Sequence, residues 1–326
     1  MPDTHFFRYF VIASGLWLMM LMIPLRAVAL PVGSSDEGSG VAEALSFQVN
    51  EHVVPFDTFA VSVMPGETVD LHFASPVPGR MYYAHAAEGR MVERRAGEWT
   101  WTAPQTPGYY PLSIGGVEGA IQLQVFVKRP YDNAEGWLNG FQIGHYAEEP
   151  RNGDPQFLPP SGFIEVHPEM EEIPVSPHFT LGEFLCKQTS GYPKYVLVDE
   201  RLILKLEHLL RQAKAEGLTD RPFHIMSAFR TPYYNRKIGN RTTYSSHLFG
   251  MAADIFIDTN GDGRMDDLTG SGRVTVEDAN LLAGFVEEQT EEEWFDPFMG
   301  GLGIYGPRPH RGPFIHVDVR GEPARW

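Results

Sequence analysis

Two histidines and two aspartates in the C-terminal half of the sequence have the types and the spacing of metal ligands. The stretch SSHLFGMAADIFID places His247 seven positions before Asp254, and FIHVDVR places His316 two positions before Asp318. Neutral imidazole and carboxylate are good zinc ligands, and a catalytic zinc typically keeps three protein ligands and leaves a fourth position for water. Because a lone His or Asp in a strand is more often structural, spacing alone leaves both interpretations open.

The elements around these residues are expected to bring them together. Gly250 allows a tight turn between His247 and a strand that carries Asp254. In FIHVDVR, residues two apart share one face of a strand. His316 can therefore be the third ligand, and Asp318 can lie close to the bound water.

The segment VDERLILKLEHLLRQAKAEG predicts an amphipathic helix, with Asp199 near its start and Gly217 just past its end. The apolar runs PFHIMSAF and GPFIHVDVR predict two strands. Helices beside an antiparallel sheet indicate an α+β domain, which we place at residues 176–326.

Several ordered motifs in this region resemble one family. The pattern S-x-H-x-x-G-x-A-x-D and the later H-V-D are similar to those of the zinc D-alanyl-D-alanine carboxypeptidases and murein endopeptidases, which share their site with lysostaphin-type and hedgehog-type domains. The upstream segments HFTLGEFLC and SAFRTPYYNR also match. The resemblance implies an α+β peptidase fold, zinc bound by His247, Asp254 and His316, and hydrolysis of peptide bonds in the stem peptides or crosslinks of peptidoglycan.

The resemblance also implies roles for residues around the zinc. Many family members carry an acidic residue three positions before the last histidine, but Pro313 stands there, so we expect Asp318 to be the general base. The equal alternative is that Asp318 orients a zinc-bound imidazole. Arg230 matches the arginine that meets the substrate, against a structural role at a strand end. Ser245 is expected to shape the histidine turn or touch substrate, and Tyr234 to line the cleft.

A second metal signal follows directly in DTNGDGRMDDLTG. It reproduces an EF-hand or dockerin-type calcium loop, with Thr269 in place of the bidentate glutamate at position 12. The alternative is an ordinary polar turn. The residues at positions 1, 3, 5, 7 and 9 of the loop, the fourth through its backbone carbonyl, are Asp258, Asn260, Asp262, Arg264 and Asp266.

The first part of the chain predicts export. Residues 1–29 contain a short segment with Arg8, an apolar run and a small-x-small end at Ala29, which is typical of a signal peptide; the alternative is an uncleaved membrane anchor. Both place the remainder outside the cytoplasm, in the periplasm or extracellular space and associated with the cell wall. The single Cys186 makes no intramolecular disulfide, and we expect a buried thiol there instead of a catalytic cysteine.

Between the signal and the peptidase region we expect three further segments. Residues 30–45 are a flexible linker, residues 46–129 alternate with period two and predict an immunoglobulin-like β-sandwich, and residues 130–175 predict an extended connector. Trp99 and Trp101 share one strand face and are expected to fill the sandwich core; the alternative is a sugar-stacking platform.

The leading functional prediction is an exported zinc metallopeptidase, either a D,D-carboxypeptidase or a murein endopeptidase. The alternative is a non-catalytic cell-wall protein that binds peptide or glycan and uses the metal structurally. The formal net charge of −16 argues against nucleic acid as a partner. A membrane contact is expected only through the N-terminal segment if it stays uncleaved.

Overall fold

The computed structural model describes residues 47–326 apart from 75, 77–78 and 117–118. The predicted signal peptide and linker lie outside the described residues. Among the helices described, none is long and apolar enough to cross a membrane.

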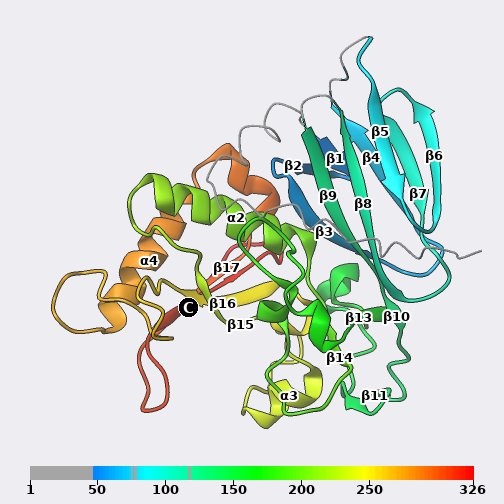
Figure 1. Ribbon diagram of the computed structural model, residues 1–326. Helices are drawn as coiled ribbons and strands as arrows, with labels where there is room; N and C mark the ends of the chain where they lie inside the picture. The colour runs from blue at the N-terminus through cyan, green and yellow to red at the C-terminus, as the bar shows by residue number, and fades with distance from the viewer. Residues whose placement is uncertain (1–46, 75, 77–78, 117–118) are drawn as a thin grey trace, which may run out of the picture. The chain divides into compact units, whose positions relative to one another are not determined.

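Residues 47–127 form two β-sheets (Figure 1). Their strand orders are β2-β1-β4-β7-β6 and β3-β9-β8-β5. The strands are β1 (Phe47–Val49), β2 (His52–Val54), β3 (Thr58–Val63), β4 (Thr68–Phe73), β5 (Tyr82–Ala86), β6 (Arg90–Arg95), β7 (Glu98–Thr102), β8 (Gly108–Gly116) and β9 (Gly119–Val127).

Aromatic side chains fill the space between these two sheets. Trp99 and Trp101 in β7 are 5% and 0% exposed, which favours the core interpretation over a sugar platform. Ring centroids of Phe73 in β4 and Tyr82 in β5 lie 4.7 Å apart, so the contact joins the two sheets. The region is therefore all-β in the residues described, while its immunoglobulin-like character stays a prediction.

The segment predicted to be an extended connector contains regular structure. β13 (Gly162–Val166) lies between β10 (Arg129–Pro130) and β14 (Lys194–Val196) in a three-stranded sheet. Strands this short give no periodicity that a sequence can reveal. The other elements here are β11 (Trp137–Leu138), β12 (Phe141–Gln142) and the 3-10 turns η1 (Arg151–Gly153), η2 (Pro155–Phe157), η3 (Pro168–Met170) and η4 (Leu181–Phe184).

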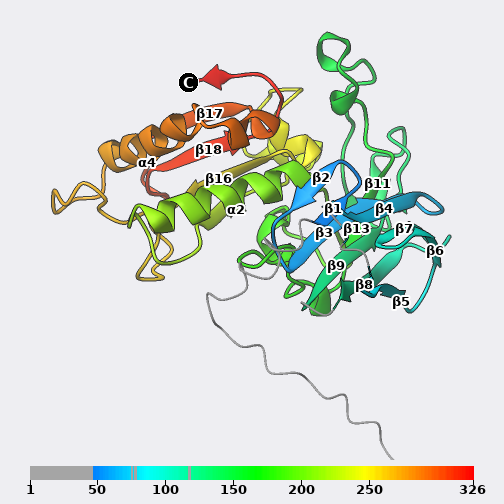
Figure 2. The ribbon, with the colours of Figure 1, turned by 90° about the horizontal axis from the view of Figure 1, so that it is seen from above.

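The C-terminal region is built on a sheet of order β15-β16-β18-β17-β19. Neighbouring strands are antiparallel except β17 and β19, which are parallel. α2 and α4 run beside each other along this sheet (Figures 1 and 2). The elements are α2 (Glu200–Ala215), β15 (His224–Ser227), α3 (Pro232–Lys237), η5 (Ser246–Phe249), β16 (Ala252–Phe256), α4 (Val276–Gln289), η6 (Glu293–Phe298), β17 (Gly301–Tyr305), β18 (Phe314–Asp318) and β19 (Ala324–Arg325). Mixed sheets with few helices agree with the predicted α+β class.

α2 forms where the sequence predicts a helix. Asp199 caps it by accepting a hydrogen bond from the Arg201 N–H at 2.9 Å. Gly217, just past the end, has φ of 73°, a left-handed conformation that glycine adopts without strain. Burying each leucine of the apolar face contributes roughly 1.5–3 kcal/mol, which holds the helix on the sheet. That buried face consists of Leu202, Ile203, Leu206, Leu209, Leu210 and Ala213.

Candidate metal centre

Neighbouring strands place two of the expected ligands opposite each other. Asp254 in β16 pairs directly with His316 in the antiparallel strand β18. Strand alternation then puts Asp318 on the same face as His316. The third ligand, His247, comes from η5, which precedes β16.

Gly250 joins η5 to β16 and has to be a glycine. Its φ is 72°, and a Cβ atom built on it would lie 2.6 Å from the backbone carbonyl carbon and oxygen of Leu197. Both the conformation and the close backbone approach exclude a side chain. The turn therefore positions His247 against the strand that carries Asp254.

Three ligand atoms converge at the sheet surface. His247 Nε2 lies 3.0 Å from His316 Nδ1 and 3.2 Å from Asp254 Oδ1, and His316 Nδ1 lies 3.1 Å from the same oxygen. The three residues are at most 4% exposed. They are the one group of three or more His, Cys, Asp or Glu side chains in the described residues with ligand atoms this close.

Hydrogen bonds on the far side of each imidazole fix its tautomer. The Nδ1–H of His247 donates to the Ala228 carbonyl at 2.6 Å, and the Nε2–H of His316 donates to Asp318 at 2.9 Å. In these tautomers His247 Nε2 and His316 Nδ1 are both unprotonated, and the lone pair of each nitrogen faces a carboxylate oxygen. Three acceptors this close repel one another unless a cation or a proton lies among them.

The electrostatics of the three groups differ. Burial lowers the pKa of His247 to about 4, which favours the neutral imidazole that binds metals. Burial also opposes charge on His316, but the carboxylates of Asp254 and Asp318 on either side of the ring outweigh it and raise the pKa of this imidazole, because a proton on Nδ1 would be shared with Asp254. For Asp254, burial is outweighed by the two histidines and Arg230, which hold its pKa well below the usual range.

The geometry fits zinc. Ligand atoms about 2.0–2.2 Å from a tetrahedral zinc are separated by roughly 3.3–3.5 Å, slightly more than the 3.0–3.2 Å found between the three atoms. Two neutral imidazoles and one carboxylate are also a donor set of catalytic zinc sites. Small side-chain rotations would therefore accommodate the ion.

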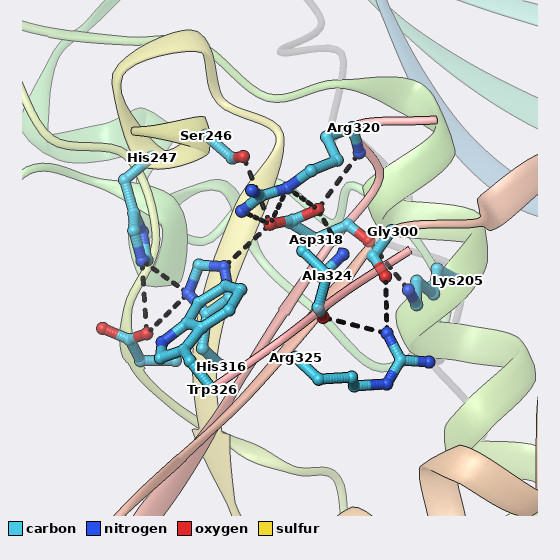
Figure 3. A network of polar contacts seen from close by, with 12 residues as sticks. Lys205, Ser246, His247, Gly300, His316, Asp318, Arg320, Ala324, Arg325 and Trp326 are labelled. Atoms are coloured by element: carbon cyan, nitrogen blue, oxygen red, sulfur yellow. Dashed lines mark hydrogen bonds and ion pairs between the residues drawn. The ribbon is translucent and has the colours of Figure 1, made fainter. Parts of the chain in front are cut away.

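Asp318 is surrounded by donors (Figure 3). Its carboxylate is 0% exposed and accepts hydrogen bonds from the Gly301 N–H at 2.7 Å and the Ser246 hydroxyl at 3.2 Å. Arg320 donates through its backbone N–H and its guanidinium. Burial acts against the charge, but His316 and Arg320 outweigh it and depress the pKa of Asp318.

Lys205 of α2 supports the same strand from the helix side. Its ammonium is 1% exposed and donates to the backbone carbonyls of Asp318 at 2.8 Å and Phe298 at 3.0 Å. Burial lowers the pKa of Lys205 to about 7. The end of β18 is thus fixed on both faces.

Arg230 contacts a ligand directly. Its guanidinium pairs with the second oxygen of Asp254, and its Nε–H donates to Ser227 at 2.9 Å. Arg230, Ser245 and Tyr234 all line a pocket of about 770 Å³ that also contains the three ligands. The structure therefore brings the predicted substrate-binding residues to the metal ligands.

Comparison with known proteins identifies the family of this region. Residues 177–271 match the family model described as Peptidase M15. Residues 177–271 therefore belong to the peptidase M15 family, and residues 176–326, which contain this match, are called the M15 region below. This family is zinc-dependent. The match includes His247 and Asp254. His316 and Asp318 lie beyond the match, and the pairing of β16 with β18 brings them to the other two residues.

No curated protein shows significant similarity to the chain. Among solved structures, it is similar to the adhesin InvE of Yersinia pseudotuberculosis, with 17% identity over 21% of this chain and 24% of the adhesin and a TM-score of 0.16. It is also similar to the LD transpeptidase LdtMt1 in complex with imipenem, with 18% identity over 23% of this chain and 38% of the transpeptidase and a TM-score of 0.16. The chain covers well under two thirds of either protein, and TM-scores this low inform neither the fold nor the function of the M15 region.

Several residues of the M15 region were not predicted from the sequence. Ser246 and Lys205 give no signal, because a serine in a turn and a lysine in an amphipathic helix are ordinary. Arg320 was detectable, since the predicted strand GPFIHVDVR places it two positions after Asp318 on the same face, although β18 itself ends at Asp318. Trp326 covers the other side of His316, with ring centroids 5.1 Å apart (Figure 3).

The side chains of the predicted calcium loop form hydrogen bonds with the backbone of the same loop. Asp258 accepts hydrogen bonds from the N–H groups of Gly261, Asp262 and Gly263 at 2.7–3.1 Å. Asp266 accepts from Thr259. These bonds are those of a polar turn, and within the described residues the loop carboxylates do not converge as the three candidate zinc ligands do. Calcium binding, including the parts assigned to Asn260 and the Arg264 carbonyl, stays a prediction.

Cys186 is 4% exposed, and burial raises the pKa of its thiol. Its sulfur lies 3.8 Å from the Gln188 side-chain oxygen. A buried thiol that resists ionisation is a poor nucleophile. The position agrees with the expected structural role.

Proposed function

We propose that this protein is an exported zinc peptidase that hydrolyses peptide bonds in the stem peptides or crosslinks of peptidoglycan. The observation that carries the proposal is the convergence of His247, Asp254 and His316 in an M15 region, with hydrogen bonds that leave one lone pair of each aimed at a common point. A pocket large enough for several residues of a peptide opens on that point.

The ligands and their supports have separate tasks. Bound zinc supplies a Lewis acid for the scissile carbonyl and lowers the pKa of a water from about 15.7 towards 7. Arg230 holds the second oxygen of Asp254 and so fixes the rotation of this carboxylate. Its remaining Nη1 group makes no hydrogen bond within the described residues, and because Arg230 lines the pocket, we assign this group to donate to a substrate oxygen.

Asp318 acts as the support of His316 in this proposal. Its oxygens already accept from His316, Arg320, Ser246 and Gly301, so no lone pair is left for a water in the pocket. The geometry therefore favours the second of the two roles considered for Asp318, orienting the imidazole.

Proton transfer then needs another acceptor. His310 is the one imidazole in the described pocket lining that is not a proposed ligand, and it is exposed to solvent. We assign His310 the task of accepting a proton from the attacking water and passing it to the leaving amine.

The proposed location rests on the N-terminal sequence and on the substrate, because peptidoglycan lies outside the cytoplasm. Export by residues 1–29 predicts a mature chain that begins just after Ala29. N-terminal sequencing of the protein recovered outside the cytoplasm tests this. A chain that retains Met1 and stays with the membrane would support the anchor alternative.

Mass spectrometry of products released from purified peptidoglycan tests the activity. Zinc-loaded protein is expected to release stem peptides, and His247→Ala is expected to release none. His85→Ala, which changes an exposed histidine of β5, is the matched control and is expected to keep activity. No products from the zinc-loaded protein would favour a non-catalytic protein that binds the cell wall.

A further inference from the structure

Positive side chains gather in the pocket of this acidic protein. The chain has 42 Asp and Glu residues against 26 Lys and Arg residues. In the described pocket lining the balance is reversed: Asp254 is its one acidic side chain. The cationic side chains of the lining are Lys187, Arg230, Arg308, Arg311 and Arg320.

Only two of these five cations are neutralised. Arg230 pairs with Asp254, and Arg320 pairs with Asp318. Lys187, Arg308 and Arg311 have no carboxylate within ion-pair distance among the described residues. A pocket between low-dielectric walls concentrates the field of such unpaired charges, so it attracts anions.

The turn that carries two of these arginines is held in place without a substrate. Arg308 and Arg311 exchange backbone hydrogen bonds of 2.8 and 3.1 Å. The Arg311 Nη1 group donates to the carbonyls of Gly306 and Gly312 at 3.1 and 3.3 Å, and the guanidinium lies 4.5 Å from the ring centroid of Phe314. These contacts fix the position of Arg311 and reduce the entropy lost when it binds a ligand.

We propose that Arg308, Arg311 and Lys187 bind carboxylate groups of the substrate, so that the pocket selects acidic peptides that carry a free carboxylate besides the bond to be cut. Guanidinium groups match the planar carboxylate in a bidentate fashion, whereas the ammonium of Lys187 acts as a point charge. The protein has a net charge of −16, so a long polyanion that extends beyond the pocket would be repelled. This favours a short peptide. This inference rests on the proposed function, because it names the substrate class of the same site.

Two peptides that differ by one charge test the inference. Both have the sequence of a stem peptide; in one a single side-chain carboxylate is free, and in the other this carboxylate is amidated. Isothermal titration calorimetry with metal-free protein measures binding without cleavage. Circular dichroism checks that the metal-free protein is folded. The free acid is expected to bind roughly tenfold more tightly than the amide, as for charge-assisted hydrogen bonds.

The variants Arg308→Gln and Lys187→Gln are expected to reduce this preference to nearly one, and both side chains are exposed enough for the fold to tolerate the change. Arg221→Gln changes an exposed arginine that is absent from the pocket lining and should keep the preference. With zinc-loaded protein, the same variants are expected to raise KM for the acid peptide with little change in kcat.

The possible results separate this inference from the proposed function. A preference for the acid that depends on Arg308 and Lys187, without any cleavage, would support the anion pocket and overturn the peptidase. Cleavage of both peptides with equal kcat/KM and equal binding would support the peptidase and overturn the anion pocket. Absence of binding to either peptide would also overturn the anion pocket.

Discussion

Asp318 accepts the Nε2–H of His316 at 2.9 Å, so the other nitrogen of the same ring faces the metal position. Strand alternation alone explains this relationship, because residues two apart in β18 share a face. The carboxylate decides the tautomer of a ligand that could otherwise present a proton to the ion.

Replacing Asp318 by Asn should weaken zinc binding and the fold together. The amide carries no charge, so Arg320, whose side chain is 14% exposed, loses its ion pair. The NH2 group of the amide also meets donors such as the Gly301 N–H where the carboxylate offered an acceptor. We expect a loss of roughly 3–5 kcal/mol in the free energy of unfolding and a 10–100-fold weaker zinc affinity. Chemical unfolding and competition with a chelator measure the two effects. Unchanged zinc affinity combined with abolished turnover would restore Asp318 as the general base.

Zinc should stabilise the fold through the three converging lone pairs. At a free zinc concentration of about 100 times Kd, binding adds roughly 2.7 kcal/mol to the free energy of unfolding. The Tm of the protein should therefore rise with zinc and fall again with a chelator, and His247→Ala should abolish this response. His85→Ala should respond like the unchanged protein. A zinc response that survives in His247→Ala would place the stabilising ion elsewhere.

The sequence predicted the ligand strands and α2 well because their signals are local. His316 and Asp318 share a face by strand alternation, and the apolar spacing of α2 matches a helix with its capping Asp199. The sequence offered two roles for Asp318 but could not decide between them, because its donors come from segments 17 and 72 positions away, at Gly301 and Ser246. Short strands such as β13 escaped prediction for the same reason, since their partners are distant in the chain.

Gly250 offers a test of the turn that positions His247. In Gly250→Ala the new Cβ would meet the Leu197 backbone at 2.6 Å in a left-handed conformation. We expect a loss of more than about 3 kcal/mol in the free energy of unfolding. Gly239→Ala is the matched control, because φ is 87° but no atom lies within 4 Å, so strain alone should cost about 1–2 kcal/mol. Equal losses in both variants would show that the backbone contact at Leu197 is unimportant.

Glu200, which is not one of the candidate metal ligands, should make the free energy of unfolding depend on pH. It accepts a hydrogen bond from the Ser62 N–H at 2.9 Å, and burial raises its pKa to about 7 from 4.5. Between these two values the folded protein keeps a proton that the unfolded chain has lost, so stability falls as the pH rises from 4.5 to 7, by at most about 3 kcal/mol. Glu200→Gln should remove this fall and be the more stable form at pH 8. If the free energy of unfolding changes with pH in the same way for both proteins between pH 4.5 and 7, the raised pKa of Glu200 is wrong.

His310 provides the test of proton transfer. If it accepts the proton of the attacking water, His310→Gln should lower kcat about 10²–10⁴-fold, because the glutamine side chain cannot act as a base. Zinc affinity and the free energy of unfolding should stay unchanged, since His310 is exposed and lies outside the three ligands. His167→Gln changes a partly exposed histidine that is absent from the pocket lining and serves as the control. A full kcat in His310→Gln would remove this histidine from the reaction and leave the other groups that line the pocket as candidates for the base.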